Sequence, residues 1–198
     1  MIISIASFKG GVSKTTTAIH IANALNRKAP TLLADGDPNE SAIAWRERGK
    51  LPFSVISTSQ LSEQAGNFKH IVLDTPARPT IEELKTICQE SDLVIIPTQP
   101  DGLGLDALIK LITSLKEINA TNYKVLFTLV PARSNAGKEA KELLKEIGAP
   151  FFKTEIQRRA VCGRAALKGI TVNEMRDGQE AWKEFQAVSK EILKYEQK

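Results

Sequence analysis

A glycine-bearing loop near the start of the chain constrains the fold more than any other feature. An apolar stretch at residues 2–6 precedes the loop from Phe8 to Thr17, and apolar side chains recur at helical spacing from Ala18 to Leu25. When a strand, a tight turn and a helix follow one another, backbone N–H groups of the first helical turn point at the turn. The helix dipole adds partial positive charge there. The stretch therefore predicts a polyphosphate site.

The residue types of the loop suit this task. The predicted phosphate site consists of Lys9, Gly10, Gly11, Val12, Ser13, Lys14, Thr15 and Thr16. Gly10 and Gly11 would let the backbone approach phosphate oxygens and adopt positive φ. Lys14 would lie on the β- and γ-phosphates, and the Thr15 hydroxyl would complete a Mg²⁺ shell. The alternative is an ordinary glycine turn between a strand and a helix, which the surrounding pattern disfavours.

The loop departs from the general G-x-x-x-x-G-K-S/T pattern, because Phe8 and Ser13 stand at the two glycine positions. It matches the variant K-G-G-x-G-K-S/T except at Ser13. In this it resembles the deviant Walker A box of the ParA/MinD family of dimerising ATPases. In that family, the lysine at the position of Lys9 reaches the nucleotide of the partner subunit. The resemblance implies ATP, Mg²⁺ and an ATP-dependent homodimer, with Lys9 and Lys14 among the catalytic residues.

Two aspartates follow the next predicted strand, residues 31–34. Asp35 and Asp37 would lie at the carboxyl end of that strand, where ligands bind in open α/β sheets. Without further context they could be turn formers and the cap of a helix over residues 39–48. The stretch also resembles the family's Walker A′ motif. That resemblance implies that Asp37 is the catalytic carboxylate and Asp35 an outer-shell magnesium or structural group, while Asn39 replaces the usual glutamine.

A third aspartate marks a predicted buried strand over Ile71–Ala77. Asp74 has the position of a Walker B acid, which would orient magnesium-bound water, and Thr75 with Pro76 would sense the γ-phosphate. The alternative is a strand that Asp-Thr-Pro merely terminates. With Asp35, whose magnesium role the resemblance implies, the expected metal set is Thr15, Asp35 and Asp74. No glutamate follows Asp74, so hydrolysis would rely on Asp37, and we expect slow turnover.

The remaining pattern predicts an α/β fold, a doubly wound and mostly parallel sheet with helices on both faces, as in P-loop NTPases. Further strands are expected at residues 53–57, 93–97, 123–130 and 151–153, and helices at 81–89, 105–118 and 136–147. Asp101 and Asp106 are interpreted as caps of the 105–118 helix. Pro131 lies at the edge where the family holds adenine. One domain over residues 1–198 is expected, without an N-terminal helix-turn-helix domain.

The last predicted helix starts at Gln179 and carries an apolar stripe. The stripe consists of Trp182, Phe185, Val188 or Ser189, and Ile192. A membrane-surface helix is one interpretation, but the acids Glu180, Glu184, Glu191 and Glu196 interrupt a basic face. Packing on the sheet is favoured, and no membrane partner is expected.

Positive charge is densest near the C-terminal third of a chain whose net charge is +4. The residues of this basic stretch are Lys153, Arg158, Arg159, Arg164 and Lys168, against the single acid Glu155. Such side chains could contact DNA phosphates without reading bases, and the near-helical spacing of the arginines could bring them together on one turn. The alternative is a solvated face, or arginines paired with Glu155 and neighbouring acids.

Together these features favour a ParA-type partition ATPase over two alternatives. It would be a cytoplasmic, nucleoid-associated ATP dimer that binds non-specific DNA and positions a plasmid, a chromosome region or a carboxysome through a ParB-like or McdB-like adaptor. The sequence does not separate these cargoes. An ATP-dependent biosynthetic ligase or kinase shares the phosphate loop but needs a substrate pocket. An iron–sulfur ATPase needs cluster cysteines, and Cys88 is interpreted instead as a small buried residue within a helix.

Overall fold

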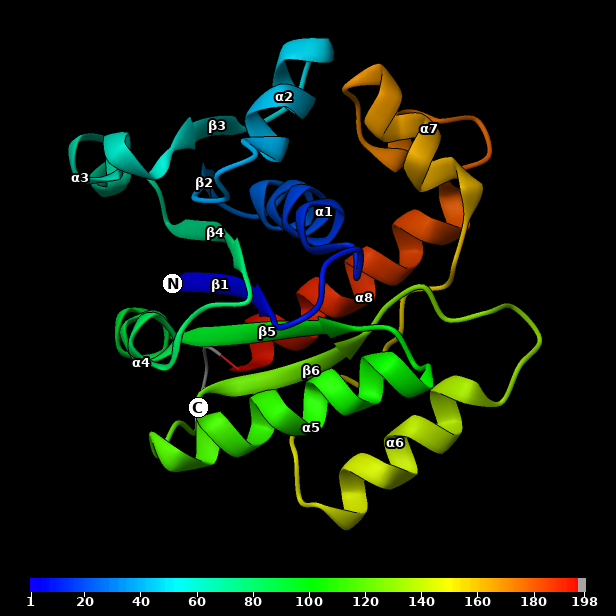
Figure 1. Ribbon diagram of the computed structural model, residues 1–198. Coiled ribbons are helices and arrows are strands. Elements are labelled where there is room, and N and C mark those ends of the chain that lie inside the picture. Colours follow the sequence, from blue (N-terminus) through cyan, green and yellow to red (C-terminus); the bar gives the residue numbers. More distant parts are fainter. Residues whose placement is uncertain (196–198) are drawn as a thin grey trace.

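Six strands form one parallel sheet in the computed structural model, which describes residues 1–195 (Figure 1). They are β1 (Ile2–Ser7), β2 (Thr31–Asp35), β3 (Ser54–Ser57), β4 (His70–Ala77), β5 (Leu93–Thr98) and β6 (Tyr123–Phe127). Their order across the sheet is β3-β2-β4-β1-β5-β6, and each neighbouring pair is parallel. The predicted α/β fold with a doubly wound sheet is confirmed.

Helices cover both faces of this sheet. They are α1 (Lys14–Asn26), α2 (Ser41–Arg48), α3 (Leu61–Gln64), α4 (Ile81–Glu90), α5 (Gly102–Glu117), α6 (Ala136–Glu146), α7 (Ala160–Lys168) and α8 (Gln179–Tyr195), with 3-10 turns at Thr58–Gln60, Ala65–Asn67 and Val172–Glu174. Figure 1 shows α1, α2, α7 and α8 on one face and α4, α5 and α6 on the other. Each layer has its own buried apolar cluster.

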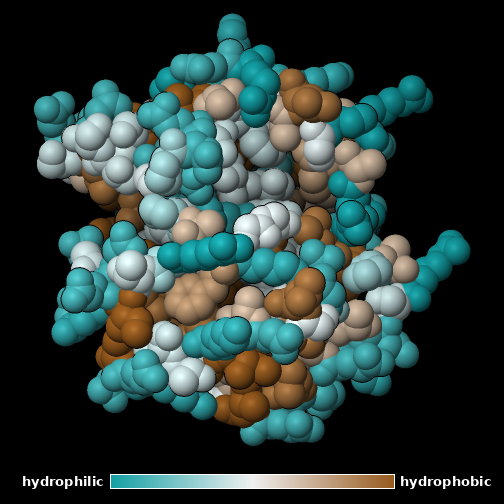
Figure 2. Space-filling model, in the orientation of Figure 1, coloured by the Kyte–Doolittle hydropathy of each residue, from teal (hydrophilic) through white to brown (hydrophobic). Residues whose placement is uncertain are grey.

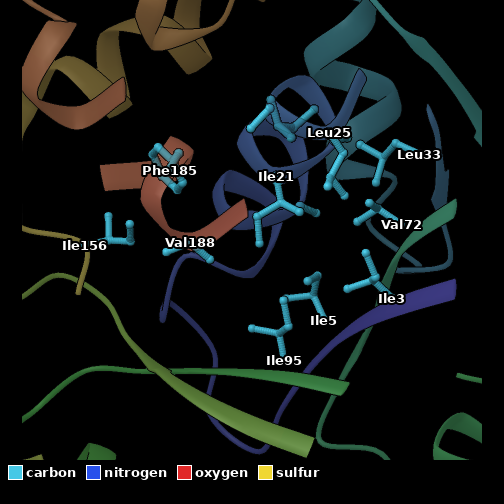
Figure 3. Close-up of a cluster of buried hydrophobic side chains, with 14 of the residues drawn as sticks. Ile3, Ile5, Ile21, Leu25, Leu33, Val72, Ile95, Ile156, Phe185 and Val188 are labelled. Carbon is cyan, nitrogen blue, oxygen red and sulfur yellow. The ribbon is translucent and has the colours of Figure 1, made fainter. Parts of the chain in front are cut away.

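Strand side chains alternate between these two layers. Ile3 and Ile5 of β1 point into the cluster that also holds Phe185 of α8 (Figure 3), while Val94 and Ile96 of β5 belong to the opposite cluster. All four are at most 1% exposed. A strand that is covered on both faces needs apolar residues at consecutive positions. Strands β2 and β5 have such consecutive apolar residues.

The phosphate loop leaves the sheet where the strand order reverses. From β1 the chain runs through α1 to β2 on one side, whereas the chain after β4 runs through α4 to β5 on the other side of β1. Ligands of open parallel sheets bind in the crevice at such a switch point. Asp35 of β2 pairs in register with Asp74 of β4 beside it. The topology thus collects the loop and both carboxylates at one edge.

The apolar stripe of α8 packs inside the molecule. Trp182, Phe185, Val188, Ser189 and Ile192 are all buried, and all but Ser189 belong to the cluster between α8, α1 and the sheet. The prediction that this stripe packs on the sheet is confirmed; Glu196, named with the interrupting acids, lies outside the described residues. None of the described helices is both long enough and apolar enough to cross a bilayer.

Some predicted boundaries differ from the structure. The predicted strand over residues 123–130 ends at Phe127, because Leu129 has a positive φ of 53° that breaks the extended backbone. The predicted strand at residues 151–153 is a single bridge between Phe151 and Val125. Asp101 caps α5 through the N–H of Gly104, as expected, whereas Asp106 lies inside the helix and does not cap it.

Candidate active site

The loop between β1 and α1 frames a cavity of about 280 Å³. Its lining consists of residues 9–16, all eight predicted phosphate-site residues, together with Asp37, Asn39 and Ala77. Gly11 and Ser13 have positive φ values of 77° and 65°. Gly10 does not, so the expectation of positive φ is correct for Gly11 and wrong for Gly10: the turn requires the left-handed conformation at positions 11 and 13. Ser13 adopts it at a conformational cost that glycine would not incur.

Lys14 holds two carboxylates at the centre of the site. Its side-chain nitrogen lies 3.1 Å from Asp37 Oδ2 and 3.7 Å from Asp74 Oδ1. Burial alone would raise the pKa of Asp37, but the N–H of Asn39 and the charge of Lys14 outweigh that effect and lower it. An ionised Asp37 can accept a proton or orient a water molecule. The three side chains come from the loop helix, the β2–α2 connection and β4.

Asp74 carries a buried oxygen that the described protein leaves without a hydrogen bond. Thr15 Oγ1 donates to Asp74 Oδ2 at 2.6 Å, whereas Oδ1 is fully buried and has no hydrogen-bond partner within residues 1–195. Burial raises the pKa of Asp74 to about 6, against the opposing effect of Lys14. A hydroxyl beside a carboxylate with a spare oxygen suits Mg²⁺, which prefers oxygen ligands.

Magnesium sites of this kind need few protein ligands. The described residues contain no cluster of three or more His, Cys, Asp or Glu side chains arranged to hold a metal. Mg²⁺ in phosphate-binding enzymes is commonly held by one or two protein groups, with substrate phosphates and water completing the shell. Thr15 and Asp74 therefore fit the ion that the sequence implied.

Asp35 shapes the backbone around the site. Its Oδ1 accepts the N–H of Asp37 at 3.1 Å, and its Oδ2 accepts the N–H groups of Ala42 and Ile43 at 2.8 and 3.0 Å. The sequence left a magnesium role and a structural role open for Asp35. These three bonds favour the structural role, because both oxygens already fix the turn after β2 and the first turn of α2.

Asn39 is the site residue whose role sequence reasoning missed. Its backbone N–H and its side-chain amide donate to Asp37 Oδ1 at 2.9 and 2.8 Å. The opposite oxygen of Asp37 faces Lys14, so the carboxylate is held from both sides. The signal in the sequence was the Asp-Pro-Asn order, since the side chain of an aspartate in a turn commonly accepts the backbone N–H two residues further on.

Lys9 lies apart from this central group. Its ammonium is 3.2 Å from Asp101 Oδ1 at the start of α5, and its side chain is 28% exposed, against 9% for Lys14. Asp101 was predicted as a helix cap, which it is, but its contact with Lys9 was not foreseen. The two lysines of the loop therefore have different neighbours, one inside the cavity and one at its rim.

Pro131, the predicted adenine-edge residue, is exposed on the connection after β6 and is not among the residues that line the cavity. The same connection does touch the loop, since Thr128 Oγ1 donates to the backbone oxygen of Val12 at 2.9 Å. The adenine role of Pro131 remains a prediction.

The predicted basic stretch is partly neutralised. Arg159 pairs with Glu184 at 2.7 Å, and Arg164 pairs with Asp177. Arg158 and Arg159 precede α7, held in extended backbone by the bond from Arg158 N–H to Val130 O, so the expected single helical turn is wrong.

Lys153, Arg158 and Lys168 are exposed. Ion pairing with neighbouring acids, the alternative considered for this stretch, applies to two of its five members.

Both cysteines are shielded. Cys88 is buried within α4, as the sequence predicted, and Cys162 is half-buried in α7 on the other face of the sheet (Figure 1). Burial raises the pKa of both thiols, that of Cys162 to about 11. Both therefore remain protonated near neutral pH, the form that binds metals weakly.

Comparison with known proteins agrees with this geometry. The sequence profile of the CobQ/CobB/MinD/ParA nucleotide binding domain matches residues 3–172. Maintenance of carboxysome distribution protein A of Gloeobacter kilaueensis is 33% identical over 201 residues, which cover 96% of this chain and 93% of that protein. Protein ParA of Rhizobium radiobacter is 28% identical over 195 residues, covering 90% and 87%.

A solved structure shares the fold. The ATP complex of a Cyanothece McdA variant superposes with a TM-score of 0.73 at 19% identity, covering 96% of this chain and 95% of that one. The deviant loop, the three aspartates, the sheet order and the profile match agree with one another. The chain belongs to the ParA/MinD group of deviant Walker A ATPases within the CobQ/CobB/MinD/ParA nucleotide-binding family.

Proposed function

We propose that this protein is a partition ATPase that dimerises on ATP, binds DNA without sequence preference and positions a large cargo through an adaptor protein. The relatives named above support this, since one is named for carboxysome distribution and another is a ParA. The adaptor would be McdB-like or ParB-like.

The observation that carries the proposal is the separation of the two loop lysines. Lys14 is buried between Asp37 and Asp74, where it would neutralise phosphate charge in its own subunit. Lys9 is at the rim, and its ammonium contacts only Asp101 among the described residues. A cation at the rim can meet a nucleotide held by a second subunit, so a complete site would need two copies of the chain.

The hydrolysis step would rest on Asp37. Asn39 and Lys14 hold its carboxylate in one orientation and favour its ionised form, so it can orient the attacking water and accept a proton. Thr15 and Asp74 would hold Mg²⁺, which when bound supplies charge neutralisation for the phosphates. No glutamate stands next to Asp74, so a single weak base serves the water and turnover would be slow.

Exposed cations would provide contacts to DNA. Lys153, Arg158 and Lys168 of the basic stretch are exposed and form no salt bridge within residues 1–195, whereas Arg159 and Arg164 are already paired. A dimer of two subunits has twice as many phosphate contacts as a monomer and therefore a higher avidity for DNA. Because the dimer would form on ATP, DNA binding would depend on ATP.

The test is the oligomeric state under three conditions. We expect light scattering to give a dimer with ATP and Mg²⁺, and a monomer with ADP or without nucleotide. A monomer under all three conditions, at protein and nucleotide concentrations far above the nucleotide affinity, would contradict the proposal.

A further inference from the structure

Two short helices meet backbone to backbone on the α1 side of the sheet. Gly49 follows α2 and Gly169 follows α7, and a Cβ atom added to either glycine would lie within 2.6 Å of main-chain atoms of the other helix end. Trp45 Nε1 donates to Ile170 O at 3.1 Å, and Arg48 Nε donates to Ala166 O at 3.0 Å. The carboxyl ends of α2 and α7 therefore form one fixed junction (Figure 1).

Three exposed cations project from this junction. Arg48 ends α2, Lys50 follows Gly49, and Lys168 ends α7; we call these the junction cations. Within residues 1–195 none of the three forms a salt bridge. Other arginines nearby in sequence do: Arg46 pairs with Glu47, Arg159 with Glu184, and Arg164 with Asp177. Figure 2 shows hydrophilic residues over the top of the molecule, where Figure 1 places α2. Residues far apart in sequence thus give one positive surface.

We propose that the junction cations form a contact surface for the phosphate backbone of double-stranded DNA. The inference rests on the proposed function, and it adds α2, to which the sequence assigned no such role. The side-chain hydrogen bond of Arg48 goes to the backbone carbonyl oxygen of Ala166, so this contact brings no acid to offset the charge of the guanidinium. Lys50 and Lys168 lie beside it, and their long side chains can contact phosphates of the DNA backbone. Phosphate contacts position a protein on DNA without recognising its base sequence.

An anionic membrane is the competing ligand for a positive surface. Membrane-surface helices need a wide apolar face beside their cations. Here Leu167, 78% exposed, is the one large apolar side chain of α7 that is exposed, and α2 exposes none. A surface with three exposed cations and a single exposed large apolar side chain is better suited to DNA than to a membrane.

The experiment compares two double variants with equal loss of charge. Lys50→Ala/Lys168→Ala removes two junction cations, and Lys85→Ala/Lys138→Ala removes two exposed lysines from α4 and α6 on the opposite face. Binding of fluorescent duplexes of unrelated sequence is measured with ATP and Mg²⁺ over a range of salt concentrations. Light scattering checks that each protein still dimerises on ATP.

The salt dependence reports the number of phosphate contacts. We expect the slope of log K against log salt to become shallower by about 1.8 if one subunit's pair touches the duplex, and by about 3.6 if both do. The control variant should keep the parental slope. A junction variant that dimerises and keeps the parental slope would overturn the inference and the assignment of Lys168 to DNA. The proposed function would stand, because Lys153 and Arg158 are exposed and could still contact phosphates. A parent that binds no duplex, or binds only vesicles of anionic lipid, would overturn both.

Discussion

The ammonium of Lys9 and the carboxylate of Asp101 form an ion pair of 3.2 Å that links the phosphate loop to the start of α5. Asp101 Oδ1 also accepts the N–H of Gly104 and so caps the helix. If Lys9 serves a partner subunit, it must leave Asp101 to do so. In that case the Lys9–Asp101 pair would favour the monomer.

Asp101→Asn should make ATP-dependent dimerisation easier. Asparagine keeps the cap but removes the charge that holds Lys9, so the dimer should form at a lower protein concentration. Sedimentation with ATP over a concentration series measures this. Asp101→Ala is the matched control, because it removes the cap as well and should cost about 1 kcal/mol of stability. An Asn variant that needs the same or a higher concentration would contradict the prediction.

Replacing Asp37 and replacing Lys14 should have different consequences. Asp37→Ala should retain ATP binding and lose hydrolysis by about a hundredfold or more, since a water-positioning group acts mainly in the transition state. Lys14→Ala should lose nucleotide affinity itself, by about tenfold or more, because a charge-assisted hydrogen bond in the ground state disappears. Calorimetric titration and phosphate release separate the two. Hydrolysis at the parental rate in Asp37→Ala would assign the role to another carboxylate.

Ser13→Gly should raise stability or nucleotide affinity. Ser13 has φ of 65°, a conformation that costs a non-glycine residue on the order of 1 kcal/mol, and its hydroxyl makes no capping bond to α1. Glycine removes that cost. Chemical denaturation and nucleotide titration of both proteins provide the measurement. If both quantities stay unchanged or fall, the loop has adapted to serine.

His20 should make the fold sensitive to acid. Its Nδ1 donates to Thr16 O at 2.7 Å, its Nε2 accepts the N–H of Val172 at 3.0 Å, and its ring stacks on Phe185. Burial lowers its pKa from 6.5 to about 4. The unfolded chain therefore binds a proton more readily than the folded one. The contribution of His20 to the free energy of unfolding is therefore fully present above about pH 6.5 and declines as the pH falls toward 4.

The size of that effect is measurable. Between about pH 8 and about pH 5, the free energy of unfolding should fall by about 2 kcal/mol more in the parent than in His20→Gln. Urea unfolding at both pH values gives the comparison, and the difference between the two proteins removes the contribution of all other groups. Parallel declines would show that His20 titrates normally in the folded state.

The fold and the central residues of the site could be predicted because both depend on local patterns. Consecutive apolar residues mark buried parallel strands, and a motif places Lys14 and Thr15 by their spacing alone. Asp37 could be placed because it follows β2 by two residues, and Asp74 because it lies within the buried apolar strand β4, which continues past it to Ala77.

The parts that could not be predicted depend on contacts between distant segments. Lys9 and Asp101 are 92 residues apart, and Arg159 and Glu184 are 25 apart. The sequence shows a positive charge at Arg159, but only the structure shows that an acid of α8 lies beside it and neutralises it. In the same way, Gly49 and Gly169 reveal the docking of α2 on α7 only once their backbones are seen in contact.

The central claim is that Lys9 completes the site of a partner subunit. A mixing experiment tests it most directly: Lys9→Ala and Asp37→Ala, each inactive alone, are combined before ATP is added. In a mixed dimer, the subunit with intact Asp37 can receive Lys9 from its partner. With random pairing and one working site in each mixed dimer, phosphate release should recover to at most about a quarter of the parental rate. A mixture as inactive as its two components would show that Lys9 acts within its own subunit, and the account would be wrong.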